Sequence, residues 1–237
     1  MSEYRRLRHR SVARVLDVLN AELLTRTQCY FGGGTRIALE LNEYRESEDL
    51  DFICSELAGY RTLRAKISNR SLGDLIPKSH ADVSLLREVR ADQYGIRTVL
   101  NVQDEPLKFE IILEARIHVS ATKVKGIPVP VLDRISCFAE KWLANADRWN
   151  DQAVLSRDAI DLAFMLAAWK SEDAITGAEL ASRAYGDAIG RAGRDASAKL
   201  LENTAYRKRC VDSLAIADSK VLVSGLKLLA KISKGFR

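Results

Sequence analysis

The hydrophobic pattern of the chain changes once, near the proline-containing stretch 126–131. Before this stretch, short runs of apolar and β-branched residues are separated by turn-forming residues, which is typical of β-strands. After it, alanine-rich segments with apolar residues three or four positions apart continue almost to residue 237, which is typical of α-helices. We therefore expect a two-lobed α/β (α+β) protein, with a mixed β-sheet in residues 1–130 and a helical domain in residues 131–237.

The same patterns predict the individual elements. In the first lobe the candidate helices are 3–26, a segment that begins at Thr35, and 58–67, and the candidate strands are 29–31, 50–54, 83–89, 96–102 and 107–113. The last three strands are separated by turn signals, a spacing that favours an antiparallel meander. In the second lobe the candidate helices are 132–148, 156–170, 176–203 with a break near Gly190, and 205–233.

Several classes of protein are disfavoured by what the sequence lacks. No stretch approaches the roughly 18 apolar residues of a membrane-spanning helix. The N-terminus has no continuous apolar core of the kind found in secretory signals. The four cysteines are far apart and form no C-x-x-C pair, which favours buried, reduced thiols over a disulfide or zinc framework. We expect a cytoplasmic protein without a membrane partner.

The net charge of +5 is unevenly distributed along the chain. Residues 204–237 hold eight lysines and arginines against two aspartates, a net charge of +6, and four arginines lie within residues 5–10. Basic ends favour a polyanionic partner such as RNA, because binding releases condensed counterions. Basic residues that only solvate helix faces and cap helix C-termini explain the same distribution equally well.

A glycine run is followed by closely spaced carboxylates. Glycines 32–34 and Thr35 precede Asp49, which lies fifteen residues after Gly34 in the segment S-E-D-L-D-F, and Asp51 follows it. On an extended strand Asp49 and Asp51 share a face, and carboxylates at that spacing can bridge a pair of Mg²⁺ ions. The glycines bring backbone N–H groups close to a triphosphate, and Thr35 adds a hydroxyl at a helix N-terminus. The pattern predicts a nucleotide-phosphate site beside metal.

A third carboxylate is available on a later strand. In the run 107–113 the odd positions are apolar, so Glu110 projects to the opposite face. If this strand lies next to 50–54, Glu110 completes the metal-binding cluster. Alternatively, Glu110 is an exposed residue on a half-solvated strand and pairs with Lys108.

The Gly-Gly-Thr turn, the S-x-D-L-D-F segment and the later carboxylate together resemble the DNA polymerase beta-type nucleotidyltransferases. More narrowly, they resemble the AbiEii/AbiGii toxin family, whose members include tRNA-directed nucleotidyltransferase toxins. Two helical segments also fit: A-E-K-W at 139–142 resembles that family's helix with an essential lysine, and R-D-A-I-D at 157–161 resembles its R-D-x-x-D motif. The resemblance implies a polymerase beta-type mixed sheet followed by a helical lobe.

The resemblance also implies roles for the helical motifs. Lys141 would reach across a cleft to neutralise charge on a phosphate of the nucleotide; alone, it could be a solvated helix lysine. Asp158 would face the active site and orient the acceptor or hold Lys141. Asp161 would lock the helix as the i,i+4 partner of Arg157, although such a pair is also a common surface salt bridge.

The predicted site can now be stated in full. The expected catalytic residues are Asp49, Asp51, Glu110, Lys141 and Asp158, and the metal ligands for two Mg²⁺ ions are Asp49, Asp51 and Glu110. The expected nucleotide-binding residues are Gly33, Gly34, Thr35, Arg36, Ser47 and Lys141. The sequence departs from the family pattern in two places, because Arg36 stands where a small or apolar residue is common and the third carboxylate is Glu rather than Asp. Arg36 could contact phosphate or point to solvent.

The predicted function follows from these assignments. We expect a Mg²⁺-dependent nucleotidyltransferase toxin of a toxin–antitoxin or abortive-infection system, which transfers a nucleoside monophosphate from a nucleoside triphosphate to an acceptor. The resemblance and the basic termini suggest the 3′ end of tRNA, or other RNA, as acceptor and a cognate antitoxin as partner. Two alternatives remain open: transfer to a protein or small molecule, and a non-catalytic RNA-binding module.

Overall fold

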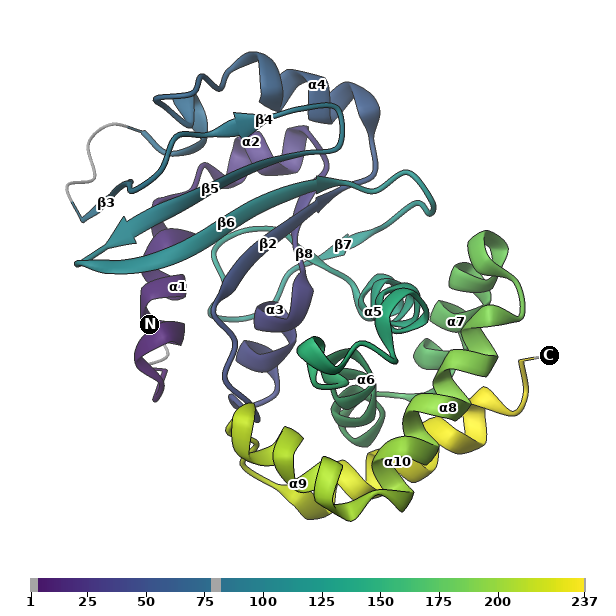
Figure 1. Ribbon diagram of the computed structural model, residues 1–237. Helices are drawn as coiled ribbons and strands as arrows, with labels where there is room; N and C mark the ends of the chain where they lie inside the picture. Colours follow the sequence, from purple (N-terminus) through teal and green to yellow (C-terminus); the bar gives the residue numbers. More distant parts are fainter. Residues whose placement is uncertain (1–3, 78–81, 237) are drawn as a thin grey trace. The chain divides into compact units, whose positions relative to one another are not determined.

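The computed structural model describes residues 4–77 and 82–236, which form two compact units (Figure 1). The sheet unit comprises residues 1–39 and 47–133, and the helical unit comprises residues 40–46 and 134–237. The expectation of an α/β fold with a mixed sheet and a helical C-terminal region is confirmed. None of the helices in the described part of the chain is long and apolar enough to cross a membrane.

The sheet unit is built on a mixed sheet with the strand order β3-β5-β6-β2-β1-β8-β7, in which β4 also pairs with β5. The strands are β1 Cys29–Phe31, β2 Asp49–Cys54, β3 Val83–Leu85, β4 Arg90–Ala91, β5 Gly95–Val102, β6 Glu105–Leu113, β7 Ala121–Thr122 and β8 Val131–Leu132. β5 pairs antiparallel with β3 on one side and with β6 on the other, as the meander prediction requires, whereas β2 pairs with β6 in parallel.

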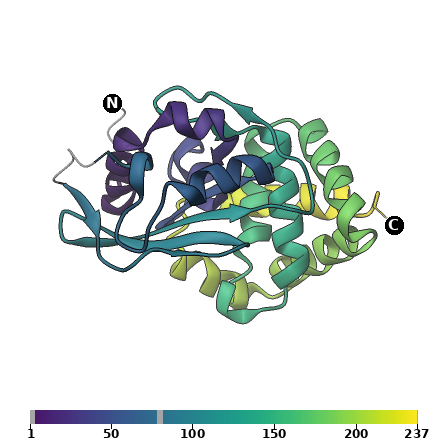
Figure 2. The same cartoon turned by 90° about the horizontal axis from the view of Figure 1, so that it is seen from above.

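One face of this sheet is covered by three helices: α1 Leu7–Val18, α2 Ala21–Arg26 and α4 Leu57–Ala65. Figure 2 shows these helices, coloured purple to blue, on one side of the sheet. The apolar residues that alternate along β2 and β6 share a core with them. Phe52 lies at its centre, with ring centroids 5.6 Å from Phe31 and 5.8 Å from Phe109. The polar residues of the same strands therefore lie on the other face.

The segment after β3 differs from its prediction. The strand expected over 83–89 ends at Leu85, because the backbone N–H groups of Leu86 and Arg87 both donate to the carbonyl of Val99, at 2.8 and 3.2 Å. Two residues that face one partner residue are a β-bulge, which interrupts regular pairing. The ladder resumes as the short strand β4, where Arg90 pairs with Arg97. The helix predicted over 3–26 is likewise two helices, α1 and α2.

The helical unit contains α5 Arg134–Arg148, α6 Arg157–Ala168, α7 Ser171–Tyr185, α8 Ala188–Glu202, α9 Thr204–Ser213 and α10 Ser219–Ser233. The break predicted near Gly190 lies instead at Gly186, which has a φ of +58° that favours glycine. Gly190 lies inside α8, and the lack of a side chain there leaves room for Phe236, whose carbonyl oxygen would lie 2.2 Å from a Cβ. The helix predicted over 205–233 is two helices, and Asp218 caps the second by accepting from the N–H groups of Lys220 and Val221.

The segment 40–46 belongs to the helical unit although it follows helix α3, Gly33–Glu40. The ring of Tyr44 stacks on Phe164, with centroids 4.2 Å apart, and the carbonyl of Tyr44 accepts from the N–H of Ala217 at 2.8 Å. No periodicity in the sequence marks this segment as part of a helical core.

The four cysteines are buried and free, in agreement with the expectation of reduced thiols. Burial raises the pKa of Cys54 to about 11, and it also raises the pKa values of Cys29 and Cys210. Thiols in such surroundings remain protonated at neutral pH and are poor nucleophiles.

Close packing of α10 against α6 gives a first testable prediction. A Cβ at Gly225 would lie 2.0 Å from the carbonyl oxygen of Ala163, so Gly225→Ala must push the two helices apart. We expect the free energy of unfolding, measured by urea denaturation, to fall by about 1–3 kcal/mol. Lys227→Ala, at an exposed position of the same helix, should change it by less than about 0.5 kcal/mol. Equal effects of the two substitutions would contradict this packing.

Candidate active site

Asp49, Asp51 and Glu110 lie on one face of the sheet, on the neighbouring parallel strands β2 and β6. Asp51 and Glu110 are register partners, and Asp49 is the partner of Lys108. All three acidic residues are partly buried, while Leu50 and Phe109, which alternate with them, are buried in the core. The condition placed on Glu110, that its strand lies beside 50–54, is therefore met.

Cationic side chains accompany these carboxylates. Glu110 forms an ion pair with Arg97, its register partner on β5, and Arg97 also lies 3.5 Å from Asp92. The Nζ of Lys108 lies 3.7 Å from Oδ1 of Asp49. The alternative partner expected for Glu110, Lys108, is thus wrong. Within residues 4–77 and 82–236, no group of three or more His, Cys, Asp or Glu side chains is positioned to hold a metal ion as it stands, and the carboxylate of Glu110 is turned toward Arg97.

The glycine turn lies directly against Asp51. The N–H of Gly32 donates to the carbonyl of Asp51 at 2.8 Å, and a Cβ at Gly33 would lie 2.3 Å from Oδ2 of Asp51. Gly33 also has a φ of +67°, so both its conformation and its surroundings require glycine. We call Asp49, Asp51 and Glu110 the carboxylate row. Helix α3 begins at Gly33 and includes Gly34, which places the unpaired N–H groups of its first turn beside this row.

Thr35 and Ser47 connect this turn to the start of β2. The hydroxyl of Thr35 donates to the carbonyl of Asp49 at 2.5 Å and lies 2.8 Å from Oγ of Ser47. These contacts hold α3 next to Asp49. Arg36 is fully buried, so the expectation that it could point to solvent is wrong.

In the helical unit Lys141 is buried between two aspartates. Its Nζ lies 2.9 Å from Oδ1 of Asp158 and 2.7 Å from Oδ2 of Asp161. Arg148 adds two contacts to Asp158, at 2.7 and 3.1 Å. The reading of Lys141 as a solvated helix lysine is therefore wrong, and Asp158 holds Lys141, which was one of its two expected roles.

The expected partner of Asp161 is also corrected. Its carboxylate accepts two hydrogen bonds from Arg45, at 2.6 and 2.9 Å, and a third from the hydroxyl of Tyr44 at 2.5 Å. Asp161 is fully buried and faces these groups and Lys141 rather than Arg157. Sequence reasoning missed Arg45 and Tyr44, because they lie 116 and 117 positions from Asp161 and carry no local signal.

These contacts determine the protonation states of the network. Burial alone would raise the pKa of Asp158, but the positive charges of Lys141 and Arg148 outweigh it and lower that pKa well below its usual range. Burial opposes ionisation of Asp161 in the same way, and Arg45 and Lys141 lower its pKa. Burial would lower the pKa of Lys141, whereas the two aspartates raise it. The two carboxylates and the Lys141 ammonium are therefore ionised at neutral pH.

This network predicts an acid-dependent loss of stability. Because the pKa of Asp161 is lower in the folded than in the unfolded chain, its contribution is present above about pH 4 and is lost as the pH falls through the folded value. At neutral pH Asp161→Asn should lower the free energy of unfolding by about 3–5 kcal/mol, since Arg45 and Lys141 lose a charged partner. The variant should also lose less stability than the wild type below about pH 4.

Urea unfolding over a series of pH values tests both statements. The control is Asp212→Asn, which removes an exposed i,i+4 pair with Lys208 in the same unit and should cost about 0.5 kcal/mol or less. A variant at Asp161 as stable as the control, or one with the acid dependence of the wild type, would contradict the assigned network.

Comparisons with known proteins extend this picture. The AbiEii family, described as nucleotidyl transferase AbiEii toxin of type IV toxin–antitoxin systems, matches residues 14–216. No match was found among curated proteins.

Solved structures with the same fold cover nearly the whole chain. Two crystal structures from Helicobacter pylori, one of them of JHP933, have a TM-score of 0.54 and sequence identities of 19% and 18%. They cover 97% of this chain and 96% and 93% of their own. MenT4, a nucleotidyltransferase toxin from Mycobacterium tuberculosis H37Rv, has a TM-score of 0.53 and 15% identity over 98% of this chain and 87% of its own. Because the family match spans most of the sequence, from the first helix to the end of α9, the chain belongs to the AbiEii family of nucleotidyltransferase toxins of type IV toxin–antitoxin systems.

Proposed function

We propose that this nucleotidyltransferase uses Mg²⁺ to transfer a nucleoside monophosphate from a nucleoside triphosphate to the 3′ end of tRNA or other RNA, in the cytoplasm. The observation that carries the proposal is the placement of Asp49, Asp51 and Glu110 on adjacent strands beside the turn at Gly33. Carboxylates in such a row provide hard oxygen ligands, and the helix start beside them provides N–H donors for phosphate.

The residues present fit a divalent metal. Oδ1 of Asp49 is buried and accepts no hydrogen bond in the described part of the chain, and its ion-pair partner, the Nζ of Lys108, lies 3.7 Å away. The missing Cβ of Gly33 leaves space against Oδ2 of Asp51. Asp49 and Asp51 would hold the metal, and Glu110 would join them once its carboxylate leaves Arg97. Bound Mg²⁺ supplies charge neutralisation for in-line displacement at the α-phosphorus.

The remaining site residues bind and orient in this proposal. The first N–H groups of α3, at Gly33 and Gly34, donate to phosphate oxygens, and Thr35 with Ser47 keeps that turn against β2. Lys141, in the helical unit, stays a predicted phosphate-binding residue, and Asp158 positions its ammonium and raises its pKa. Arg36, at the start of α3, stays a predicted nucleotide-binding residue, although its side chain is fully buried.

The RNA acceptor and the antitoxin partner are proposed on different grounds. Basic residues at both ends of the chain favour RNA over a small molecule as acceptor. Membership of a type IV toxin–antitoxin family supports a cognate antitoxin as partner and growth arrest as the outcome of the reaction. Transfer to a protein side chain or a small molecule remains the alternative within catalysis.

The central experiment removes one charge from the row. Asp51→Asn keeps the shape of the side chain but weakens metal binding, so transfer from an α-labelled triphosphate to total cellular RNA should fall by about 100-fold or more. The free energy of unfolding without metal should not fall, because repulsion of Asp51 by Glu110 is relieved. Glu105→Gln, an exposed position on the same strand as Glu110, should transfer at the wild-type rate.

The label itself decides between the alternatives. Label that migrates with tRNA supports the proposed acceptor, whereas label on protein or on a small molecule replaces it. Wild-type transfer by folded Asp51→Asn, or triphosphate consumption that continues without divalent metal, would overturn the metal-dependent mechanism. RNA binding without any triphosphate consumption by the wild type would favour the non-catalytic alternative.

The close approach of the glycine turn gives a second prediction. In Gly33→Ala the new methyl group would collide with the carboxylate of Asp51 and would favour a different φ. We expect binding of Mg²⁺, measured by calorimetry, to weaken by about tenfold or more, because the carboxylate must move from its position. Gly235→Ala, where the nearest atom would be 3.3 Å from the Cβ, is the matched control. Unchanged Mg²⁺ affinity in Gly33→Ala would remove Asp51 from the proposed ligands.

A further inference from the structure

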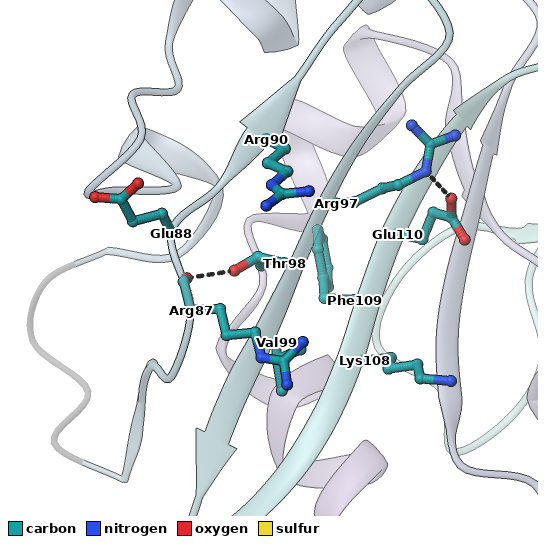
Figure 3. A pocket seen from close by; sticks show the side chains of 9 residues that line it. All are labelled: Arg87, Glu88, Arg90, Arg97, Thr98, Val99, Lys108, Phe109 and Glu110. Atoms are coloured by element: carbon teal, nitrogen blue, oxygen red, sulfur yellow. Dashed lines mark hydrogen bonds and ion pairs between the residues drawn. The ribbon is translucent and has the colours of Figure 1, made fainter.

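A cavity of about 570 Å³ lies over β5 and β6, beside the carboxylate row (Figure 3). This volume is within the range of about 300–1,000 Å³ that small-ligand sites occupy. Its charged lining residues are Arg87, Glu88, Arg90, Arg97, Lys108 and Glu110, and all of them belong to the sheet unit. Glu110 therefore borders both the cavity and the proposed metal site.

The backbone on one side of this cavity is held in place by the β-bulge. The N–H groups of Leu86 and Arg87 donate to Val99, and the carbonyl of Arg87 accepts from the hydroxyl of Thr98 at 2.7 Å. Arg90 is paired with Arg97 in the β4–β5 ladder. Arg87 follows the bulge and Arg90 lies in β4, so both project from hydrogen-bonded backbone. Figure 3 shows both side chains among the residues that line the cavity.

The cavity carries an excess of positive charge. Its charged lining residues sum to +2, and the ion pair of Glu110 with Arg97 uses one of the two carboxylates. Arg87 and Arg90 are exposed, and neither forms an ion pair with any residue in 4–77 or 82–236. Guanidinium groups without a carboxylate partner are suited to bidentate hydrogen bonds with phosphate.

The strand order indicates from which side of the carboxylate row the attacking hydroxyl would approach. The glycine turn follows β1, the carboxylates lie on β2 and β6, and the cavity lies over β5 and β6. The carboxylate row therefore separates the turn from the cavity. In an in-line displacement the attacking oxygen and the leaving oxygen lie on opposite sides of the phosphorus. If the leaving pyrophosphate lies at the glycine turn, the attacking hydroxyl enters from the cavity side.

We propose that this cavity binds the phosphodiester backbone of the acceptor strand next to its terminal hydroxyl, through Arg87 and Arg90. The inference rests on the proposed function. In the reaction it serves, the acceptor oxygen forms a bond to the α-phosphorus, and the bond from that phosphorus to the oxygen shared with the β-phosphate breaks. Pyrophosphate leaves with the electron pair of the broken bond, and the hydroxyl proton is released to solvent.

Direct binding tests the cavity without catalysis. The probe is a short, 5′-fluorescein-labelled single-stranded RNA with a free 3′ hydroxyl, and its anisotropy is measured with EDTA and without triphosphate. Arg87→Ala with Arg90→Ala should weaken binding about tenfold or more. The slope of log K against log salt should become shallower by about 1.4, at about 0.7 for each lost phosphate contact. Arg61→Ala with Arg64→Ala, exposed on α4 over the opposite face, should leave both quantities unchanged.

Transfer kinetics distinguish this proposal from the one on which it rests. The double variant should raise the KM for RNA and leave the KM for the triphosphate unchanged. A double variant that raises only the KM for the triphosphate would overturn the cavity assignment. RNA binding and a salt slope equal to those of the wild type would overturn it too. Neither result would contradict the proposed transfer activity. Polyglutamate and unlabelled RNA are also compared as competitors of the labelled RNA. If polyglutamate displaces the labelled RNA with equal potency, the cavity binds an acidic protein instead. Absence of transfer by the wild type, with RNA binding lost only in the cavity variant, would reject the enzymatic proposal and retain the cavity.

Discussion

The parallel pairing of β2 with β6 makes Asp51 and Glu110 register partners, and the proximity of these two acidic residues constrains the side chains around them. Two carboxylates on adjacent strands repel each other unless cations or hydrogen-bond donors lie nearby. Arg97 accordingly pairs with Glu110 from β5, and Lys108 approaches Asp49. The proposed divalent metal would supply the same positive charge.

In the helical unit, two neighbouring carboxylates are neutralised by cationic side chains. Asp158 and Asp161 are buried, and their charges are compensated within the unit by three cationic side chains: Arg45, Lys141 and Arg148. Such a network is costly to break from one side, because the remaining partner is left charged in a medium of low polarity. Arg45 brings the segment 40–46 into this network, so a piece of chain from the N-terminal half becomes part of the helical core.

Much of the fold and of the site could be predicted because alternation along a strand is local information. The alternating residues of 107–113 assigned Glu110 to the polar face, and the parallel pairing agrees. Helix interruptions were harder to predict. Gly190 and Gly186 have the same local signal, but only Gly186 has a positive φ, whereas Gly190 lies inside α8 and leaves room for Phe236. Arg157 was the obvious partner of Asp161 at i,i+4 spacing, but a bidentate bond from distant Arg45 took its place.

The family, the two-part organisation and the side chains that share each strand face could be predicted from the amino-acid sequence, because motifs and periodicity act over a few residues. Tertiary structure alone decided the strand neighbours, the partner of Asp161 and the cavity between the bulge and β6. These features join residues tens of positions apart, and such contacts depend on competition among all segments for burial and for charge compensation. Local sequence patterns do not predict the outcome of that competition.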